Sequence, residues 1–352
     1  MINLFNAQIE SLSIHRVGNK NRGENIFLSA STFKLDDEIK PLIKEYFLKP
    51  FREKEESYYR FHHETDIEFN ELYNLSNKIF DDPYNTHEYS KRIATLLYEQ
   101  STHPHIKSGE VYVVYFEGMQ LDNIKVPAIG IFKSELKHDF LQFEQSQSNL
   151  EMVVQQGVNL QKLDKGAIIF NSNQAEGFKI LSVDSNRYDT KYWLENFLGV
   201  DVLADENYFT KNYLNFAKNF AKDVVLPAED KKQEVMFMNR SMDYFAKNDD
   251  FEESNYINSV IDNPDLIPEF QNYKTEKAPK YKVEDLTSFP IANKAVTDAR
   301  KKIKNVITLD TNIQIKMDFV SAESAEKFVE KGWDEDKQMY YYLVYFNKEE
   351  KK

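Results

Sequence analysis

The chain has no cysteine and no long apolar run among its 352 residues. Without thiols it has no disulfide, no thiolate nucleophile and no cysteine-ligated zinc site, as is usual in a reducing compartment. No stretch approaches the roughly 18 apolar residues of a membrane span. The opening MINLFNAQIESLSIHRV alternates apolar and polar residues, unlike a secretory signal. We therefore expect a cytoplasmic protein that does not enter the membrane.

The motifs of common catalytic sites are also missing. The sequence contains no GxxxxGK[ST] or GxGxxG loop for a nucleotide and no GxSxG nucleophile elbow. Two histidine pairs, His62 with His63 and His103 with His105, do not form the H-E-x-x-H motif of zinc-binding helices. We expect no metal site, no cofactor and no enzymatic activity.

One catalytic alternative stays open. Asp122 precedes a predicted strand that ends near Glu135 and Lys137. This order resembles the D…(D/E)xK arrangement of metal-dependent nucleases, in which carboxylates hold a divalent ion and a lysine supports the attacking water. ExK triplets also arise by chance in a chain with 29% charged residues, so a solvated strand end is the competing interpretation.

The chain has ample material for hydrophobic cores. Hydrophobic residues make up 41% of it, with 26 Phe and 21 Tyr. Burial of these side chains can offset the conformational entropy of the chain without cross-links. Because 352 residues exceed what one core usually supports, two or three domains are expected.

The hydrophobic periodicity predicts an α+β protein with an N-terminal antiparallel sheet and helices, a central helical region and a small C-terminal α+β unit. The predicted boundaries are 1–185, 186–271 and 272–352, the last beginning with a basic linker. Strands are expected at 8–17, 25–30, 111–118, 126–134, 140–145, 151–157, 167–171 and 178–184, and helices at 38–51, 64–80 and 86–100. The passage from Pro264 to Pro279 is interpreted as a linker or loose helix, and strands with a short helix return after it.

Charge is segregated along the chain. The net charge is −13, which repels polyanions overall. Residues 272–316 nevertheless contain ten basic and five acidic residues. The stretch from Lys274 to Lys304 is therefore the predicted footprint for phosphate. The electrostatic screening length is about 8 Å at physiological salt, so distant carboxylates have little effect on this stretch. The candidate nucleic-acid-binding residues are Arg300, Lys301, Lys302 and Lys304, flanked by Lys280 and Lys282.

Two further interpretations stay open. The cations near residue 300 are also explained by a helix C-terminus, where positive side chains are favoured by the helix dipole. The aromatic run Tyr340, Tyr341, Tyr342, Tyr345 and Phe346 could stack on exposed bases, but alternation in a half-buried strand favours a core role for it.

Several segments resemble one protein family. IESLSIHRVGN, GEVYVVYFEG, VPAIGIFKS and above all YWLENFLGVDVLADENYFTKNYLNFAKNF, which contains Trp193 and Thr210, are similar to the bacterial nucleoid-associated proteins of the YejK/NdpA type. The resemblance implies a nucleoid location, association with double-stranded DNA and no catalytic residues. We expect weak, salt-sensitive and largely sequence-independent DNA binding, with a homo-oligomer as a further expectation. The alternative is an adaptor that a nucleoid protein partner recruits without direct DNA contact.

Overall fold

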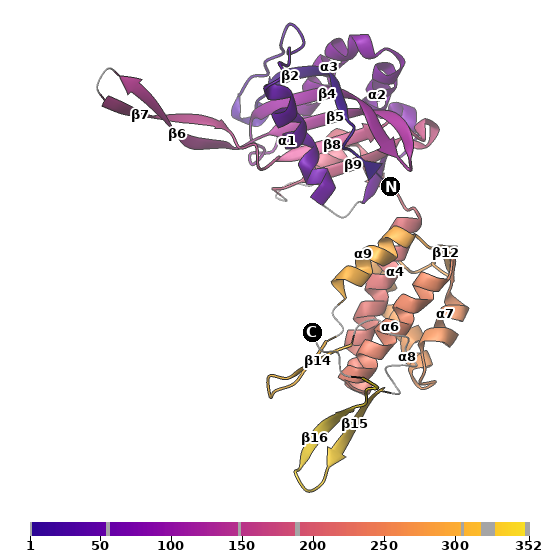
Figure 1. The fold of residues 1–352 in the computed structure, drawn as a ribbon. Coiled ribbons are helices and arrows are strands. Elements are labelled where there is room, and N and C mark those ends of the chain that lie inside the picture. The colour runs from indigo at the N-terminus through magenta and orange to yellow at the C-terminus, as the bar shows by residue number, and fades with distance from the viewer. Residues whose placement is uncertain are drawn as a thin grey trace. The chain divides into compact units, whose positions relative to one another are not determined.

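The computed structural model describes residues 2–53, 57–146, 149–186, 191–303, 306–317 and 328–348. The chain forms two compact units, Met1–Leu203 and Ala204–Lys352. The first is built on an antiparallel sheet with helices, and the second is mainly helical (Figure 1). The α+β class expected from the sequence is confirmed.

An eight-stranded antiparallel sheet forms the centre of the first unit. Its strand order is β1-β4-β5-β8-β9-β3-β10, and β2 also pairs with β4. The strands are β1 (Ile2–Asn3), β2 (Gln8–Val17), β3 (Tyr58–Phe61), β4 (Gly109–Leu121), β5 (Ile124–Ser134), β8 (Lys165–Phe170), β9 (Lys179–Asp184) and β10 (Val200–Val202). The helices are α1 (Ile39–Glu53), α2 (Glu71–Asp81) and α3 (Thr86–Gln100), with a π-helical segment at Tyr192–Leu198.

Helices cover both faces of this sheet. Val111 and Val113 of β4 join the core formed with α2, α3 and Trp193. Tyr112 and Val114, which point to the opposite face, join the core formed with α1. Because both sets of alternate side chains are buried, β4 is a continuous apolar run rather than an alternating one. The predicted strands from 111–118 to 178–184 and the helices predicted at 38–51 and 86–100 are confirmed, whereas the α-helix predicted at 64–80 begins only at Glu71.

The predicted hairpin between 8–17 and 25–30 is wrong. β2 pairs with β4, and only a single bridge links Arg16 to Phe27. The register of β2 shifts between Ile9 and Ser11, which is a β-bulge. This bulge explains the imperfect apolar alternation of the strand, since one inserted residue changes the face of every later side chain.

Two of the predicted strands leave the sheet as a separate hairpin. β6 (Lys137–Ser146) and β7 (Asn149–Val158) pair only with each other and project from the first unit (Figure 1). They are inserted between β5 and β8, which pair directly. The antiparallel order expected from the sequence is therefore correct, but the chain is a meander with an inserted arm.

The second unit packs helices around an aromatic core. Its helices are α4 (Glu206–Phe220), α5 (Leu226–Ala228), α6 (Lys231–Lys247), α7 (Glu253–Val260), α8 (Leu266–Tyr281) and α9 (Asn293–Lys302), with a π-helical segment at Ala221–Val225. Its strand pairs are β11 (Asp250–Glu252) with β12 (Ser288–Pro290), β13 (Val306–Thr308) with β14 (Gln314–Lys316), and β15 (Val329–Asp334) with β16 (Met339–Val344). Tyr213 on α4 contacts the rings of Phe251, Tyr256 and Phe289.

The passage from Pro264 to Pro279, interpreted as a linker or loose helix, forms helix α8. Phe270 and Tyr273 of this helix are buried against Phe216 and Phe220 of α4. Aromatic burial outweighs the low helix propensity of the Pro-containing segment. The short helix expected at 321–329 lies almost wholly outside the described residues.

The boundaries of the compact units differ from those expected. Trp193 and Phe197, placed in the helical domain by the sequence, belong to a core of the first unit. The main core of the second unit runs from Tyr213 to Val296 and so crosses the boundary expected after residue 271. Whether the three predicted stretches fold independently stays a prediction.

Candidate functional site

Three of the predicted DNA-binding cations share one turn of helix. Arg300, Lys301 and Lys302 form the last turn of α9, and all three are exposed. On the other side of this helix, Ala295 and Val296 are buried in the second unit. We call Arg300, Lys301 and Lys302 the basic turn. Its position satisfies both sequence interpretations, since a helix C-terminus favours cations whether or not phosphate binds there.

Acidic side chains accompany the basic turn. The Arg300 guanidinium lies 3.7 Å from the Asp243 carboxylate of α6, and the Lys301 ammonium lies 3.3 Å from Asp298 one turn earlier. Exposed pairs of this kind contribute at most about 1 kcal/mol. Both cations can therefore exchange a carboxylate for a phosphate at small cost.

The remaining basic candidates lie elsewhere. Lys280 and Lys282 are exposed at the end of α8, where Lys282 adopts a left-handed conformation that ends the helix. Lys274 is mostly buried and its ammonium lies 2.5 Å from Glu253, so it has a structural role within the predicted footprint. Lys304 lies outside the described residues.

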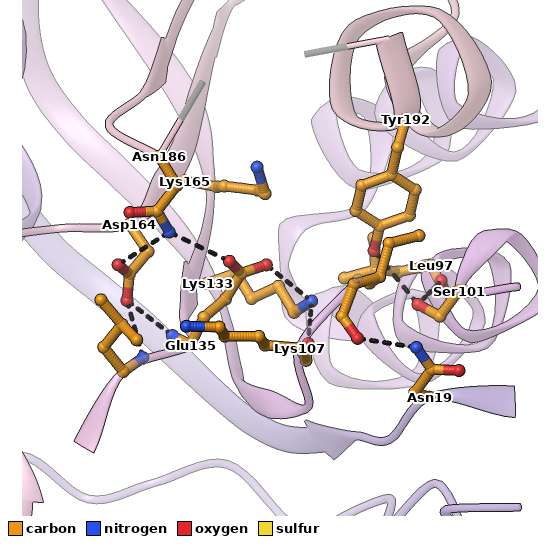
Figure 2. A network of polar contacts seen from close by, with 12 residues as sticks. Asn19, Leu97, Ser101, Lys107, Lys133, Glu135, Asp164, Lys165, Asn186 and Tyr192 are labelled. Carbon is orange, nitrogen blue, oxygen red and sulfur yellow. Dashed lines mark hydrogen bonds and ion pairs between the residues drawn. The ribbon is translucent and has the colours of Figure 1, made fainter. Parts of the chain in front are cut away.

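A second group of charged side chains, in the first unit, is buried, in contrast to the exposed basic turn (Figure 2). The side chain of Lys133 at the end of β5 is fully buried. Its ammonium lies 2.9 Å from the Glu135 carboxylate and donates a 2.7 Å hydrogen bond to the Lys107 carbonyl. Burial lowers the pKa of Lys133, and the Glu135 carboxylate opposes this shift. The cluster was not predicted, although a lysine that ends the apolar run VPAIGIF was a visible signal.

The same cluster fastens both ends of the inserted arm. Asp164, which follows β7, accepts hydrogen bonds from the backbone amides of Glu135 and Leu136, which precede β6. Asn186 donates to both Glu135 and Asp164, at 3.1 Å each (Figure 2). These contacts fix the entry and exit of the arm because every buried carboxylate in them has a donor.

Buried hydrogen bonds continue from this cluster toward the helices. The Lys133 ammonium lies 5.6 Å from the centre of the Tyr192 ring. The Tyr192 hydroxyl is 3.1 Å from Ser101, whose hydroxyl donates to the Leu97 carbonyl (Figure 2). The polar groups are satisfied by the protein itself, so the cluster has the properties of a structural network.

The nuclease constellation is not assembled. Asp122 lies in the turn before β5, whereas Glu135 follows the last residue of that strand. Eleven extended residues separate the two ends, a distance on the order of 30 Å. The Lys137 ammonium pairs with Glu110. The three side chains proposed from sequence spacing therefore cannot hold one metal ion together.

Neither histidine pair is part of an assembled metal site among the described residues. His62 and His63 border an open hollow of about 560 Å³ that Asp201 also lines. The His103 and His105 rings lie 5.2 Å apart. Within the described ranges, no group of three or more histidine, aspartate or glutamate side chains is arranged to hold a metal ion.

The C-terminal aromatic run is largely exposed, and the expected core role holds for Tyr342 alone among its five rings. Tyr340 and Phe346 are 70% and 72% exposed, whereas Tyr342 packs against the small core around Val329. Trp333 of β15 lies against Tyr340, with ring centres 4.7 Å apart. Among the described residues, no element covers one face of this hairpin, which the sequence pattern alone could not show.

Comparison with protein families gives a match over most of the chain. The model of the family described as "Nucleoid-associated protein YejK" matches residues 13–340. No curated protein matches the chain. Among the helices described, none is both long enough and apolar enough to cross a membrane. The match spans both compact units, and the chain therefore belongs to the YejK family of nucleoid-associated proteins.

Proposed function

We propose that this nucleoid-associated protein binds double-stranded DNA directly, weakly and without reading its sequence. The observation that carries the proposal is the exposure of Arg300, Lys301 and Lys302 on one turn of α9. Cations on a single turn can contact neighbouring phosphates, and such contacts position a duplex without distinguishing bases. The function needs no catalytic group, and we propose that the protein is not an enzyme.

The electrostatics favour modest affinity. Each phosphate that is neutralised releases condensed counterions, so the logarithm of the binding constant falls with the logarithm of salt by about 0.9 per contact. With Lys304, the basic turn supplies four cations and a slope of roughly −3 to −4. Asp243 and Asp298 stay close to the bound phosphates and reduce the affinity.

The test is binding to a labelled mixed-sequence duplex between about 50 and 200 mM salt. The quadruple variant Arg300→Ala, Lys301→Ala, Lys302→Ala and Lys304→Ala should lose most of the slope. The matched control removes four exposed lysines dispersed on other elements: Lys78→Ala, Lys125→Ala, Lys162→Ala and Lys218→Ala. Equal losses in the two variants would mean that net charge acts alone, and the proposed interface would be rejected.

A second candidate function is that of an adaptor held at the nucleoid by another protein. The exposed aromatic hairpin β15–β16 favours it, because Trp and Tyr side chains dominate the energetics of protein interfaces. If the wild-type protein fails to bind the duplex even at the lowest salt, the adaptor function replaces direct DNA binding.

A further inference from the structure

The inserted arm has one apolar face. Its register pairs Leu141 with Val154 and Phe143 with Met152, and the diagonal neighbour Leu150 lies on the same face. These five side chains, which we call the arm face, are 54 to 73% exposed. The arm face is therefore a continuous apolar surface on a projecting ribbon, unlike the isolated exposed side chains common on proteins.

The reverse side of the arm is mixed and acidic. Glu144 and Glu151 are paired directly across the two strands, and Gln142 and Gln155 lie on the same side. The apolar side chains on this side are Phe140 and Val153. Together the two strands carry Lys137 against Asp139, Glu144 and Glu151. This balance opposes contact with DNA, because phosphates would face more carboxylates than ammonium groups.

The arm is held at its root and uncovered along its length. An isolated two-stranded hairpin is marginally stable in water and normally needs a packing partner. The hydrogen bonds from Asp164 and Asn186 fix the root, but all of the described residues from Lys137 to Gln156 are exposed. A buried network therefore orients a surface that the rest of its own compact unit does not cover.

We propose that the arm face packs against the arm face of a second copy of this chain and closes a symmetric dimer. Five large apolar side chains of this exposure present on the order of 600 Å². Two such faces bury roughly 1,200 Å² in total, which exceeds the approximate 1,000 Å² expected of a specific interface. The geometry is a stack of two ribbons, with the sheets about 10 Å apart.

Charge selects a second copy as the occupant. Two copies of a chain with net charge −13 repel each other, so a self-interface must keep carboxylates out of contact. Glu144 and Glu151 lie on the reverse side. Asp139 lies on the same side as the arm face, next to Leu141 toward the root of the arm, where it accepts a hydrogen bond from the Gln156 amide and so stays outside the five apolar side chains. A symmetric contact is self-complementary by definition, and a purely apolar face meets that condition without requiring paired charges. The proposal does not depend on DNA binding.

The experiment measures the mass of the full chain by sedimentation equilibrium across a wide range of concentrations. The wild type should form dimers. Phe143→Glu combined with Met152→Glu should raise the dimer dissociation constant by at least roughly 100-fold, because burying the new carboxylates is strongly unfavourable. The matched control, Gln142→Glu with Gln155→Glu, adds the same charge on the reverse side and should leave the dimer nearly unchanged.

Cross-linking provides a second readout that does not require a disruptive substitution. Since the chain has no cysteine, a single introduced cysteine can react only with another copy. Met152→Cys should cross-link through a short bis-maleimide, whereas Gln142→Cys should not. The proposal is overturned if the wild type remains a monomer, or if the variants on the two sides of the arm affect dimerisation equally. A monomer whose arm binds some other protein also overturns it.

Discussion

Two charged clusters in this chain have opposite surroundings. Lys133 is fully buried at the end of β5, with Glu135 and the Lys107 carbonyl as its partners. Arg300, Lys301 and Lys302 are exposed at the end of α9, with Asp243 and Asp298 beside them. A buried charge needs a fixed partner because desolvation is expensive, whereas an exposed charge can change partners. The first cluster therefore contributes structure, and the second is the proposed phosphate contact.

The largest predicted effect comes from breaking the buried pair. Lys133→Met leaves the buried Glu135 carboxylate without its cation and should destabilise the first unit by about 3 to 5 kcal/mol. The double variant Lys133→Met with Glu135→Leu should regain much of this loss, because neither charge of this pair is then buried without the other. Chemical denaturation followed by circular dichroism measures both. The same substitution at Lys137, which pairs with Glu110 near the surface, should cost less than about 1 kcal/mol.

A buried histidine extends the comparison to pH. The Nδ1 atom of His15 accepts a hydrogen bond from the Ser29 amide, so its Nε2–H donates to Ser90. His87 and Lys91 also face this ring, and burial, followed by the charges of these two groups, lowers the pKa of His15 to about 4. The folded structure therefore holds His15 neutral.

Stability should fall as pH falls through this window. Between the ordinary pKa of 6.5 and the folded value of about 4, the unfolded chain binds a proton that the folded chain does not. The loss contributed by His15 reaches up to about 3 kcal/mol at the acidic end. Denaturation of the wild type and of His15→Gln at several pH values should show a shallower slope for the variant. Parallel slopes would remove His15 as the cause.

Removing the exposed cations should affect stability much less. Arg300→Ala, Lys301→Ala and Lys302→Ala together lose favourable interactions with the helix dipole but gain helix propensity, so the unfolding free energy should change by about 1 kcal/mol or less. Thermal unfolding measures this change. A loss as large as that for Lys133→Met would show that the basic turn is structural and would weaken the assignment of a binding role.

The smallest predicted effect concerns the acidic neighbours of the basic turn. Asp243→Asn with Asp298→Asn removes two negative charges beside Arg300 and Lys301 and should raise DNA affinity by about 2- to 5-fold at low salt. The gain should shrink as salt rises, because screening weakens exposed charges. Titration of a labelled duplex measures it, and a decrease in affinity would contradict direct phosphate contact.

The sequence predicted individual helices and strands better than it predicted which of them pair or pack together. A continuous apolar run identified β4, and helical periodicity identified α3. Both patterns are local features that can be read from the sequence. The pairing of β2 with β4 joins residues about a hundred positions apart and left no local signal. The sequence left a linker and a loose helix as alternatives for α8, because Pro264 and Pro279 suggested a break, whereas the burial of Phe270 and Tyr273 is a tertiary effect.

The same holds for the candidate site, where local features were predictable and features that depend on the tertiary structure were not. The basic turn was visible in the sequence as consecutive cations, and its place at a helix end followed from the same residues. The separation of Asp122 from Glu135 could not be inferred until the full length of β5 was known. The arm face was hidden as well, because the alternation of β6 and β7 does not reveal that their sheet ends after two strands.

The direct pairing of β5 with β8 makes the arm a modular insertion. The ladder between them extends to Lys133 opposite Lys165, beside the root of the arm, so the register of the main sheet is set without the arm. Adding or removing one cross-strand pair of residues would move the arm tip by about 3.3 Å and leave that register unchanged. Evolution can therefore vary the reach of the arm as freely as it varies the length of a surface loop.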